Sequence, residues 1–483
     1  MAKKEKNAIR LDRDGVQKVM RIRDYFGDSL GMFALNIITG LIGQLTYYYT
    51  DKVGLAAGAI ATSFMILKVF DAFTDIIMGN IIDNTKPGKE RYRPWYLKAG
   101  IPAGILVALM FAVPKGSSGM QLAYVIVTNF LLTAVLYTAM GAAYSSILMV
   151  RTNSQEERGY MGTWRAAAGY ISGMFIAILV IPISNMLGGT QSAWIKMGTI
   201  FGAILILAML ICYLTSRETA IAVGKGENPE QKEKEEEEKI SIMEAIGKLF
   251  ANKYWVIVLI LNFAAQVSYG LVNTSGTYYC KWIYGNDNLV ALLGGVGLIP
   301  TFLGFILVGP MMKRFGAVKS LKISFILGIA ANALRIINPY NLTYNIVMGC
   351  VATFANIPMM CLGGVLGAMT VEYNEYKYGL KMIARSGSAI GFGQKVASGF
   401  GASLVGWCLA AVGYSEKTES ARIAAGSMVS MGTRQAIFTF SIYIPLILYV
   451  IMLIAIMKFD LDGRIGEIRE AIAKRKETEN GNH

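Results

Sequence analysis

The sequence predicts an all-α integral membrane protein with twelve transmembrane helices in two pseudo-symmetric bundles of six. Three observations support this prediction. First, 54% of the 483 residues are hydrophobic, 16% are charged and the mean hydropathy is +0.46, which is more apolar than an average soluble domain. Second, about twelve stretches are long and apolar enough to cross a bilayer. Third, the basic residues collect in alternate loops between these stretches.

Each expected span contains about 20 mostly apolar residues, as a helix needs to cross roughly 30 Å of hydrocarbon. The spans are 29–50, 56–82, 96–114, 119–150, 160–185, 193–215, 253–284, 290–312, 320–337, 343–371, 384–413 and 434–457.

A polar segment with the sequence VGKGENPEQKEKEEEEKIS lies between the sixth and seventh spans. It has too little apolar surface to fold into a core, so we expect a linker. The expected organisation is a six-helix bundle in 1–215, a linker in 216–250, a second bundle in 251–457 and a tail in 458–483. In the tail, Ile465, Ile468 and Ile472 recur at helical spacing, which fits either a helix on the membrane surface or a solvated helix.

The distribution of basic residues predicts the topology. Of the 46 Lys and Arg residues, 36 lie in the termini and the loops that follow even-numbered spans, and 8 lie in the opposite loops. Lys68 and Lys395 are the remaining two, at membrane depth. Because cytoplasmic loops carry the excess of Lys and Arg, we expect both termini and the linker to be cytosolic. The net charge of +14 is then a consequence of topology, and no nucleic-acid partner is expected.

Several chemistries are disfavoured by what the spans contain. The five cysteines all lie in hydrophobic stretches without metal-ligand spacing, and the single histidine is His483. A histidine relay or histidine-ligated metal in the core is therefore excluded. The sequence has no GxxxxGK[ST] phosphate-binding motif, which argues against an ATP-driven pump. We expect neither an enzyme nor a resident cofactor.

The second span carries Lys68, Asp71 and Asp75, which share one helical face. A charge at bilayer depth costs on the order of 3 kcal/mol, and such residues usually face an internal cavity and serve function. The alternative is a Lys68–Asp71 ion pair that only holds helices together. With hydroxyl oxygens from Thr74 and Thr138, the two carboxylates are a plausible Na⁺ site, because hard cations prefer oxygen ligands. A proton on one carboxylate is the alternative.

Polar residues in the second half suggest a site for a hydroxylated substrate. The seventh span carries Asn262, Gln266, Asn273 and Tyr278, spaced to line a polar cavity, although hydrogen bonds between helices would explain them equally well. Lys395 lies among small residues in the eleventh span, too deep to reach the cytoplasmic boundary easily. The alternative is a packing helix whose lysine extends to the interface.

Three stretches resemble a known family at matching places in the chain: YYYTDKVGL, KVFDAFTDIIMGNIIDNTKPGKERYRPW and VEYNEYKYGLKMIARSGSAIGFGQKVASG. They are similar to the glycoside-pentoside-hexuronide:cation symporters of the major facilitator superfamily, and the likeness covers nearly the full length. The resemblance implies the major facilitator fold, a bacterial-type inner-membrane location and alternating access. It also implies that Asp71, Asp75 and Thr138 match cation ligands, that Thr74 replaces an asparagine, and that Lys68 matches an arginine.

The resemblance also assigns substrate and gating residues. Arg165 and Lys395 look like the family's two basic sugar-site residues, and Tyr144 lies near the place of a sugar-stacking tryptophan. The loop DNTKPGKERYRPW resembles the cytoplasmic gating motif, in which ion pairs break as the halves move. Its candidate gating residues are Asp83, Lys89, Arg91 and Arg93; a basic loop that only sets topology is the alternative.

The expected function is symport of a small glycoside with Na⁺ or H⁺ by a monomer in the lipid bilayer. Gly141 replaces a family aspartate, and an apolar residue near 33–35 replaces another, so Arg165 and Lys395 are expected to lack acidic partners unless Asp28 substitutes. A substrate carboxylate could pair with them, which favours an acidic glycoside such as a hexuronide or glucuronide. The alternatives are a neutral glycoside or pentoside, and a lysolipid or other amphiphile.

Overall fold

The computed structural model describes residue 11 and residues 16–83, 90–152, 154–218, 242–380 and 382–480. Within these ranges the regular structure is helical and no β-strand is present. The chain divides into two compact units, Met1–Lys225 with Ser415–Lys417, and Gly226–Tyr414 with Thr418–His483.

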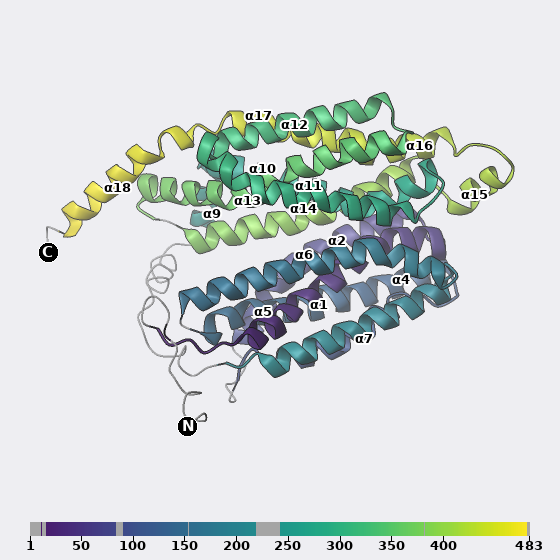
Figure 1. Cartoon of the computed structure of the whole chain (residues 1–483), viewed down its shortest axis with the longest axis horizontal. Coiled ribbons are helices and arrows are strands. Elements are labelled where there is room, and N and C mark those ends of the chain that lie inside the picture. The colour runs from purple at the N-terminus through teal and green to yellow at the C-terminus, as the bar shows by residue number, and fades with distance from the viewer. Residues whose placement is uncertain are drawn as a thin grey trace, which may run out of the picture. The chain divides into compact units, whose positions relative to one another are not determined.

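In its described residues, the first unit has six long helical segments, which Figure 1 draws in purple to teal. Its α1 packs against α6 and α7, and α3 packs against α7. The helix α2 packs against η3 and α5, which follow α4 in one continuous segment. The segments are α1 (Ile22–Tyr47) continued by the π-helix η2 (Tyr48–Val53), α2 (Ala57–Asp83), α3 (Trp95–Leu109), α4 (Ser118–Phe130) continued by the π-helix η3 (Leu131–Tyr137) and α5 (Thr138–Arg151), α6 (Gln155–Met186) and α7 (Gln191–Thr215).

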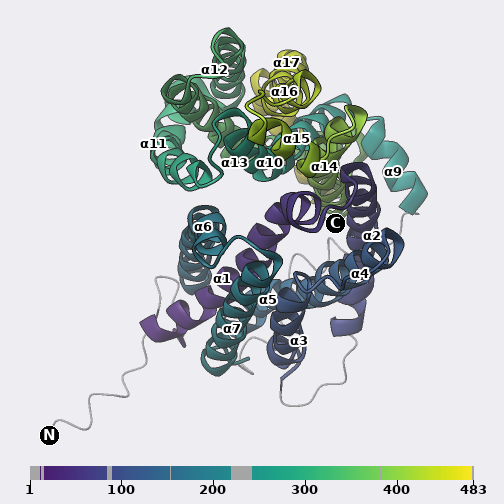
Figure 2. The same cartoon turned by 90° about the vertical axis from the view of Figure 1, so that its right-hand side faces the viewer.

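The second unit has the same number of long segments and several short helices, seen close to end-on in Figure 2. Its α10 packs against α14, and α12 packs against α13 and α17. The helices are α9 (Ile242–Phe250), α10 (Lys253–Ile283), α11 (Leu289–Phe315), α12 (Ala317–Ile337), α13 (Leu342–Tyr378), α14 (Ile383–Ala411), α15 (Glu416–Ala424), α16 (Met431–Phe438) with η5 (Thr439–Tyr443) and α17 (Ile444–Met457), η6 (Leu461–Gly463) and α18 (Ile465–Asn480).

The membrane-spanning, all-α fold is confirmed. Ten segments of the described chain are long and apolar enough to cross a membrane, and α14 with α15 is an eleventh candidate with a 59° bend. The shorter apolar helix α3 corresponds to the third expected span. The first helix begins at Ile22, earlier than the expected residue 29, because it includes the charged residues Arg23 and Asp24 that an apolar window leaves out.

Glycines allow the closest helix crossings in both units. A Cβ on Gly202 would lie 2.2 Å from the Gly104 carbonyl oxygen, so α3 and α7 meet backbone to backbone. In the second unit, a Cβ on Gly401 would lie 2.1 Å from the Val267 carbonyl oxygen, which places α14 equally close to α10. Such contacts between small residues are typical of membrane helices.

The tail packs on the protein. The side chains of Ile468 and Ile472 are buried in the core of the second unit, and α18 lies against α13. Arg469 donates two hydrogen bonds to the Glu372 carboxylate, at 2.8 and 2.9 Å. The isoleucine stripe is therefore explained by packing on the bundle, and neither expected alternative, membrane nor solvent, describes that face.

Candidate functional site

One charged group of the first unit is centred on Asp71 of α2, whose side chain is 1% exposed. The Lys68 ammonium lies 3.3 Å from Asp71 Oδ2. On the other side, the Thr138 hydroxyl donates to Asp71 Oδ1 at 3.1 Å. One turn along α2, the Thr74 hydroxyl donates to the Asp71 main-chain carbonyl at 3.0 Å, and Asp75 is half-buried. The carboxylate thus has an ammonium and a hydroxyl as its partners.

The π-helix η3 positions Thr138. This segment ends at Tyr137, and Thr138 is the first residue of α5. The Thr138 hydroxyl also lies 3.2 Å from the Thr133 carbonyl oxygen inside η3. Single π-helical turns inside membrane helices often occur at functional sites. Of the expected cation ligands, the structure therefore brings Asp71 and Thr138 into direct contact across two helices, with Thr74 and Asp75 on the adjacent turn of α2.

A second charged group joins α1, α5 and α6. Arg165 of α6 donates from Nε to Asp28 Oδ2 at 2.6 Å and from Nη2 to Asp28 Oδ1 at 2.9 Å. Its Nη1 donates to the Tyr144 carbonyl at 3.0 Å, and the guanidinium lies 3.7 Å from the centre of the Tyr144 ring. The Tyr144 hydroxyl donates to the Asp28 main-chain carbonyl at 2.9 Å. Both charged side chains are buried, Asp28 at 2% and Arg165 at 8% exposure.

This geometry removes one argument for an acidic substrate. That argument required Arg165 to lack an acidic partner unless Asp28 substituted, and Asp28 does pair with Arg165. Bidentate arginine–carboxylate pairs are among the strongest charge-assisted hydrogen bonds, so the Arg165 charge is compensated inside the protein. At Gly141, where the resemblance implied the loss of an aspartate, the position is open, because a Cβ there would meet nothing within 4 Å.

The second unit places polar groups of α10 and α14 side by side. Gln394 Nε2 donates to Asn262 Oδ1 at 2.8 Å, and the half-buried Lys395 follows Gln394 in α14. Gln266 is half-buried and Asn273 is exposed, with its amide bonded to the Tyr269 carbonyl at 2.9 Å. The expectation for Tyr278 was wrong: its ring is fully buried against Tyr414 and Phe440, so it does not share the face of the three amides.

The expected gating loop is described only in its second half, since Lys89 and the side chain of Asp83 lie outside the described residues. There, the Glu218 carboxylate accepts hydrogen bonds from three successive main-chain amides, those of Arg91, Tyr92 and Arg93, at 2.9, 2.6 and 2.9 Å. Arg93 pairs with Glu90 at 2.6 Å.

The Arg93 side chain also holds the loop to α7. Its Nε donates to the Tyr213 carbonyl at 2.6 Å, and its guanidinium lies 4.1 Å from the centre of the Tyr213 ring. Arg91 contributes to the described contacts through its main-chain amide, while Arg93 acts through its side chain as well. The start of the linker is therefore attached to this loop, a contact that the sequence analysis did not anticipate.

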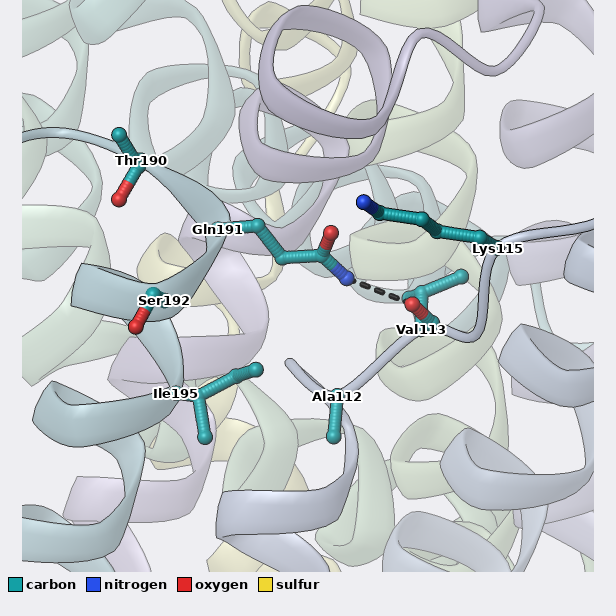
Figure 3. A pocket seen from close by; sticks show the side chains of 7 residues that line it. All are labelled: Ala112, Val113, Lys115, Thr190, Gln191, Ser192 and Ile195. Carbon is teal, nitrogen blue, oxygen red and sulfur yellow. Dashed lines mark hydrogen bonds between the residues drawn. The ribbon is translucent and has the colours of Figure 1, made fainter.

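An open pocket of about 410 Å³ in the first unit contains none of these residues. It is lined by Ala112, Val113, Lys115, Thr190, Gln191, Ser192 and Ile195. Figure 3 shows Gln191, at the start of α7, reaching across to the Val113 carbonyl, a 2.6 Å hydrogen bond. The pocket lies where the α3–α4 loop meets α7, and its lining includes no residue of either charged group.

Comparison with known proteins identifies the family. The profile described as MFS/sugar transport protein matches residues 27–463. The chain belongs to this family. It is 26% identical over 399 residues to an isoprimeverose transporter of Lactiplantibacillus pentosus, which covers 80% of each chain. It is 24% identical over 459 residues to the inner membrane symporter YicJ of Escherichia coli (strain K12), which covers 92% of each chain. The protein is thus a multi-pass membrane transporter and not an enzyme.

Solved structures support the same fold. The nucleoside transporter NupG superposes with a TM-score of 0.62 at 13% identity, covering 91% of this chain and 100% of NupG. A bacterial homologue of the human lysosomal transporter Spinster, in an inward-facing and unoccupied conformation, gives a TM-score of 0.61 at 17% identity over 95% of this chain and 99% of that chain. At these identities the likeness concerns the fold alone. The predicted major facilitator architecture and the family resemblance are confirmed.

Proposed function

We propose that this transporter carries a neutral glycoside into the cell together with a monovalent cation, by alternating access. The observation that supports the cation is the cluster around Asp71. Two carboxylates, Asp71 and Asp75, and two hydroxyls, Thr74 and Thr138, provide oxygen atoms from two helices. Hard cations such as Na⁺ prefer such ligands. The described residues contain no group of three or more His, Cys, Asp or Glu that could hold a metal ion.

Lys68 connects cation binding with the substrate in this proposal. The Lys68 ammonium forms an ion pair with the Asp71 carboxylate. A cation that binds to this carboxylate therefore replaces the ammonium as its counter-charge. The displaced ammonium becomes available to donate hydrogen bonds to a sugar hydroxyl. A ligand shifts an equilibrium only by its differential affinity for the two states, and competition between Lys68 and the cation for one carboxylate provides that difference. Lys68 is then both the expected substrate residue and part of the coupling.

The choice of a neutral glycoside follows from the Arg165–Asp28 pair. With its charge compensated at 2.6 and 2.9 Å, Arg165 does not require a carboxylate from the substrate. The Tyr144 ring is buried, at 4% exposure, with the Arg165 guanidinium 3.7 Å from its centre, so in this proposal Tyr144 holds Arg165 in place and does not stack on the sugar. In the second unit, the amides of Asn262 and Gln394 and the Lys395 ammonium are donors suited to hydroxyl groups. Gln266 and Asn273 lie on α10 with Asn262. We include them in the proposed substrate site because of their spacing in the sequence.

Transport by the purified protein in vesicles tests both parts. Asp71→Asn and Asp75→Asn should abolish cation-driven accumulation, while Asp460→Asn, at an exposed carboxylate, should leave it unchanged. Imposed Na⁺ and H⁺ gradients, applied separately, distinguish the two ions. A neutral glycoside should compete for uptake better than its matching uronide. Normal accumulation by either Asp variant would refute the cation site, and uronide preference in the parent protein would refute the neutral substrate.

We also propose that both termini and the 216–250 linker are cytosolic, that the protein lies in a bacterial-type inner membrane and that it works as a monomer. The excess of basic residues on one side, 36 against 8, supports the orientation. Asp83, Lys89, Arg91 and Arg93 would then lie on the cytosolic side, where a gating loop acts.

A further inference from the structure

The short helix α9 (Ile242–Phe250) has three distinct faces. Helical geometry, at about 100° per residue, places Ala245 and Leu249 on one side. Glu244 and Lys248 share a second side, and the third side is apolar, with Met243, Ile246 and Phe250. The first side is buried, and the second carries an ion pair of 2.8 Å. The third is exposed, with 76% of Met243, 42% of Ile246 and 58% of Phe250 accessible.

The buried side fixes α9 to the end of the second unit. Ala245 and Leu249 form a core cluster with Trp255 of α10 and Met382 at the start of α14. The Trp255 indole donates to Ser386 Oγ at 2.8 Å, which joins α10 to α14 below the cluster. The Phe250 ring also contacts the Trp255 ring, with centres 5.3 Å apart.

Hydrogen bonds also fix the turn between α9 and α10. It consists of Ala251 and Asn252, and the Asn252 side chain is fully buried. Its oxygen accepts from the Tyr254 and Trp255 amides at 3.0 and 3.3 Å, and its nitrogen donates to Asn374 Oδ1 at 2.7 Å. The exposed apolar side of α9 therefore has a fixed direction relative to the spanning helices α10 and α13.

We propose that α9 is a membrane-surface anchor whose exposed side, Met243, Ile246 and Phe250, inserts among lipid acyl chains. A helix at the end of a spanning segment lies at the depth where hydrocarbon meets water. At this position a helix needs one side against the protein, one side in lipid and one side in water. The helices that it packs on also carry exposed apolar residues, such as Ile383 of α14 and Ile260 of α10.

The charges of α9 determine which lipids it needs. Glu244 and Lys248 cancel on the helix, and Lys253, just beyond it, lies 3.4 Å from Asp460. Anionic lipid headgroups therefore add little to the binding of this segment, and insertion of α9 depends on its apolar contacts with acyl chains. The second end of the linker is then held at the membrane surface, while its first end is attached to the 90–93 loop through Glu218.

Collision measurements on spin labels in the reconstituted full-length protein test the anchor. In a background where the five native cysteines are replaced, single labels are placed at Met243→Cys, Ile246→Cys and, as the matched control, Lys248→Cys. In phosphatidylcholine bilayers, the ratio of oxygen to nickel-chelate collisions should be several-fold higher at 243 and 246 than at 248. Adding phosphatidylglycerol should leave the ratios unchanged.

Two results would overturn the proposal. If the labels at 243 and 246 collide with the nickel chelate as often as the label at 248, the apolar side lies in water. If their preference for oxygen appears only when phosphatidylglycerol is present, the attraction to the membrane is electrostatic. A photo-reactive residue at Ile246 in the chain with its native cysteines gives an independent readout. Adducts with phospholipid support the anchor, and adducts confined to protein refute it. Neither readout depends on transport, so the anchor and the proposed symport fail separately.

Discussion

Replacing Asp28 by asparagine should destabilise the protein strongly. The substitution keeps the shape of the side chain but removes its charge, and it leaves the Arg165 guanidinium buried without its carboxylate. Two short hydrogen bonds, at 2.6 and 2.9 Å, are affected. Breaking a buried ion pair by removing one partner typically costs about 3–5 kcal/mol, because an uncompensated charge remains. We expect Asp28→Asn to lower the free energy of unfolding by that amount.

A double-mutant cycle separates the pair from its surroundings. The free energy of unfolding is measured in detergent micelles for the parent, Asp28→Asn, Arg165→Gln and the double variant. Because the double variant contains no buried uncompensated charge at this place, its loss should be smaller than the sum of the two single losses by about 2 kcal/mol or more. Asp460→Asn is the control, since its pair with Lys253 is about 60% exposed on both sides and should contribute less than about 1 kcal/mol.

Additive losses would refute this reasoning, because they would mean that the two side chains do not stabilise each other. A loss for Asp28→Asn no larger than that of the exposed control would do the same. The Tyr144→Phe variant refines the result. It removes one hydrogen bond, from the hydroxyl to the Asp28 carbonyl, and should cost about 1 kcal/mol without changing the coupling between the two charges.

Three further predictions concern other contacts. Thr138→Val should weaken the cation dependence of uptake about tenfold, since one hydrogen-bonding oxygen at Asp71 is lost, whereas Thr138→Ser should keep it; equal behaviour of the two variants would exclude the hydroxyl as a ligand. Glu218→Gln should speed proteolytic cleavage of the loop that contains 91–93, because a neutral amide binds the three main-chain N–H groups less strongly, and unchanged cleavage would contradict a structural role. A cysteine at Asn228, which lies outside the described residues, should react with a membrane-impermeant reagent only after cells are opened; labelling in intact cells would overturn the proposed topology.

The fold was predictable because its signals are local. An apolar run can be recognised without knowing any contact, so the spanning helices follow from the sequence. The orientation that the loops rich in Lys and Arg favour stays a prediction. The Lys68–Asp71 contact is local in the same sense, since residues three apart on a helix are neighbours. The error at Tyr278 was avoidable for the same reason: at 16 positions from Asn262, helical geometry places it about 160° away from that residue.

The Asp28–Arg165 pair could not be predicted in this way. The two residues are 137 positions apart, and each was recognised as polar within a largely apolar sequence. Their pairing depends on the packing of α1 against α6. The family resemblance places Asp28 away from the usual position of a span-one acid, so the sequence suggested a missing partner and left Asp28 only as a possible substitute. Only the bundle geometry brings Asp28 to the guanidinium.

The position of Thr138 depends on a feature that composition does not reveal. A π-helical turn forms when one residue more than usual separates bonded main-chain groups, and LLTAVLY, the sequence of η3, has no glycine or proline to mark it. The turn ends immediately before Thr138, whose hydroxyl reaches Asp71 from the adjacent helix. The acids of α2 are thus encoded locally, while the hydroxyl that completes the oxygen cluster depends on the bundle. At the proposed cation site, selectivity would depend on the distances among these oxygens, and so on the packing between α2 and the η3–α5 segment rather than on either helix alone.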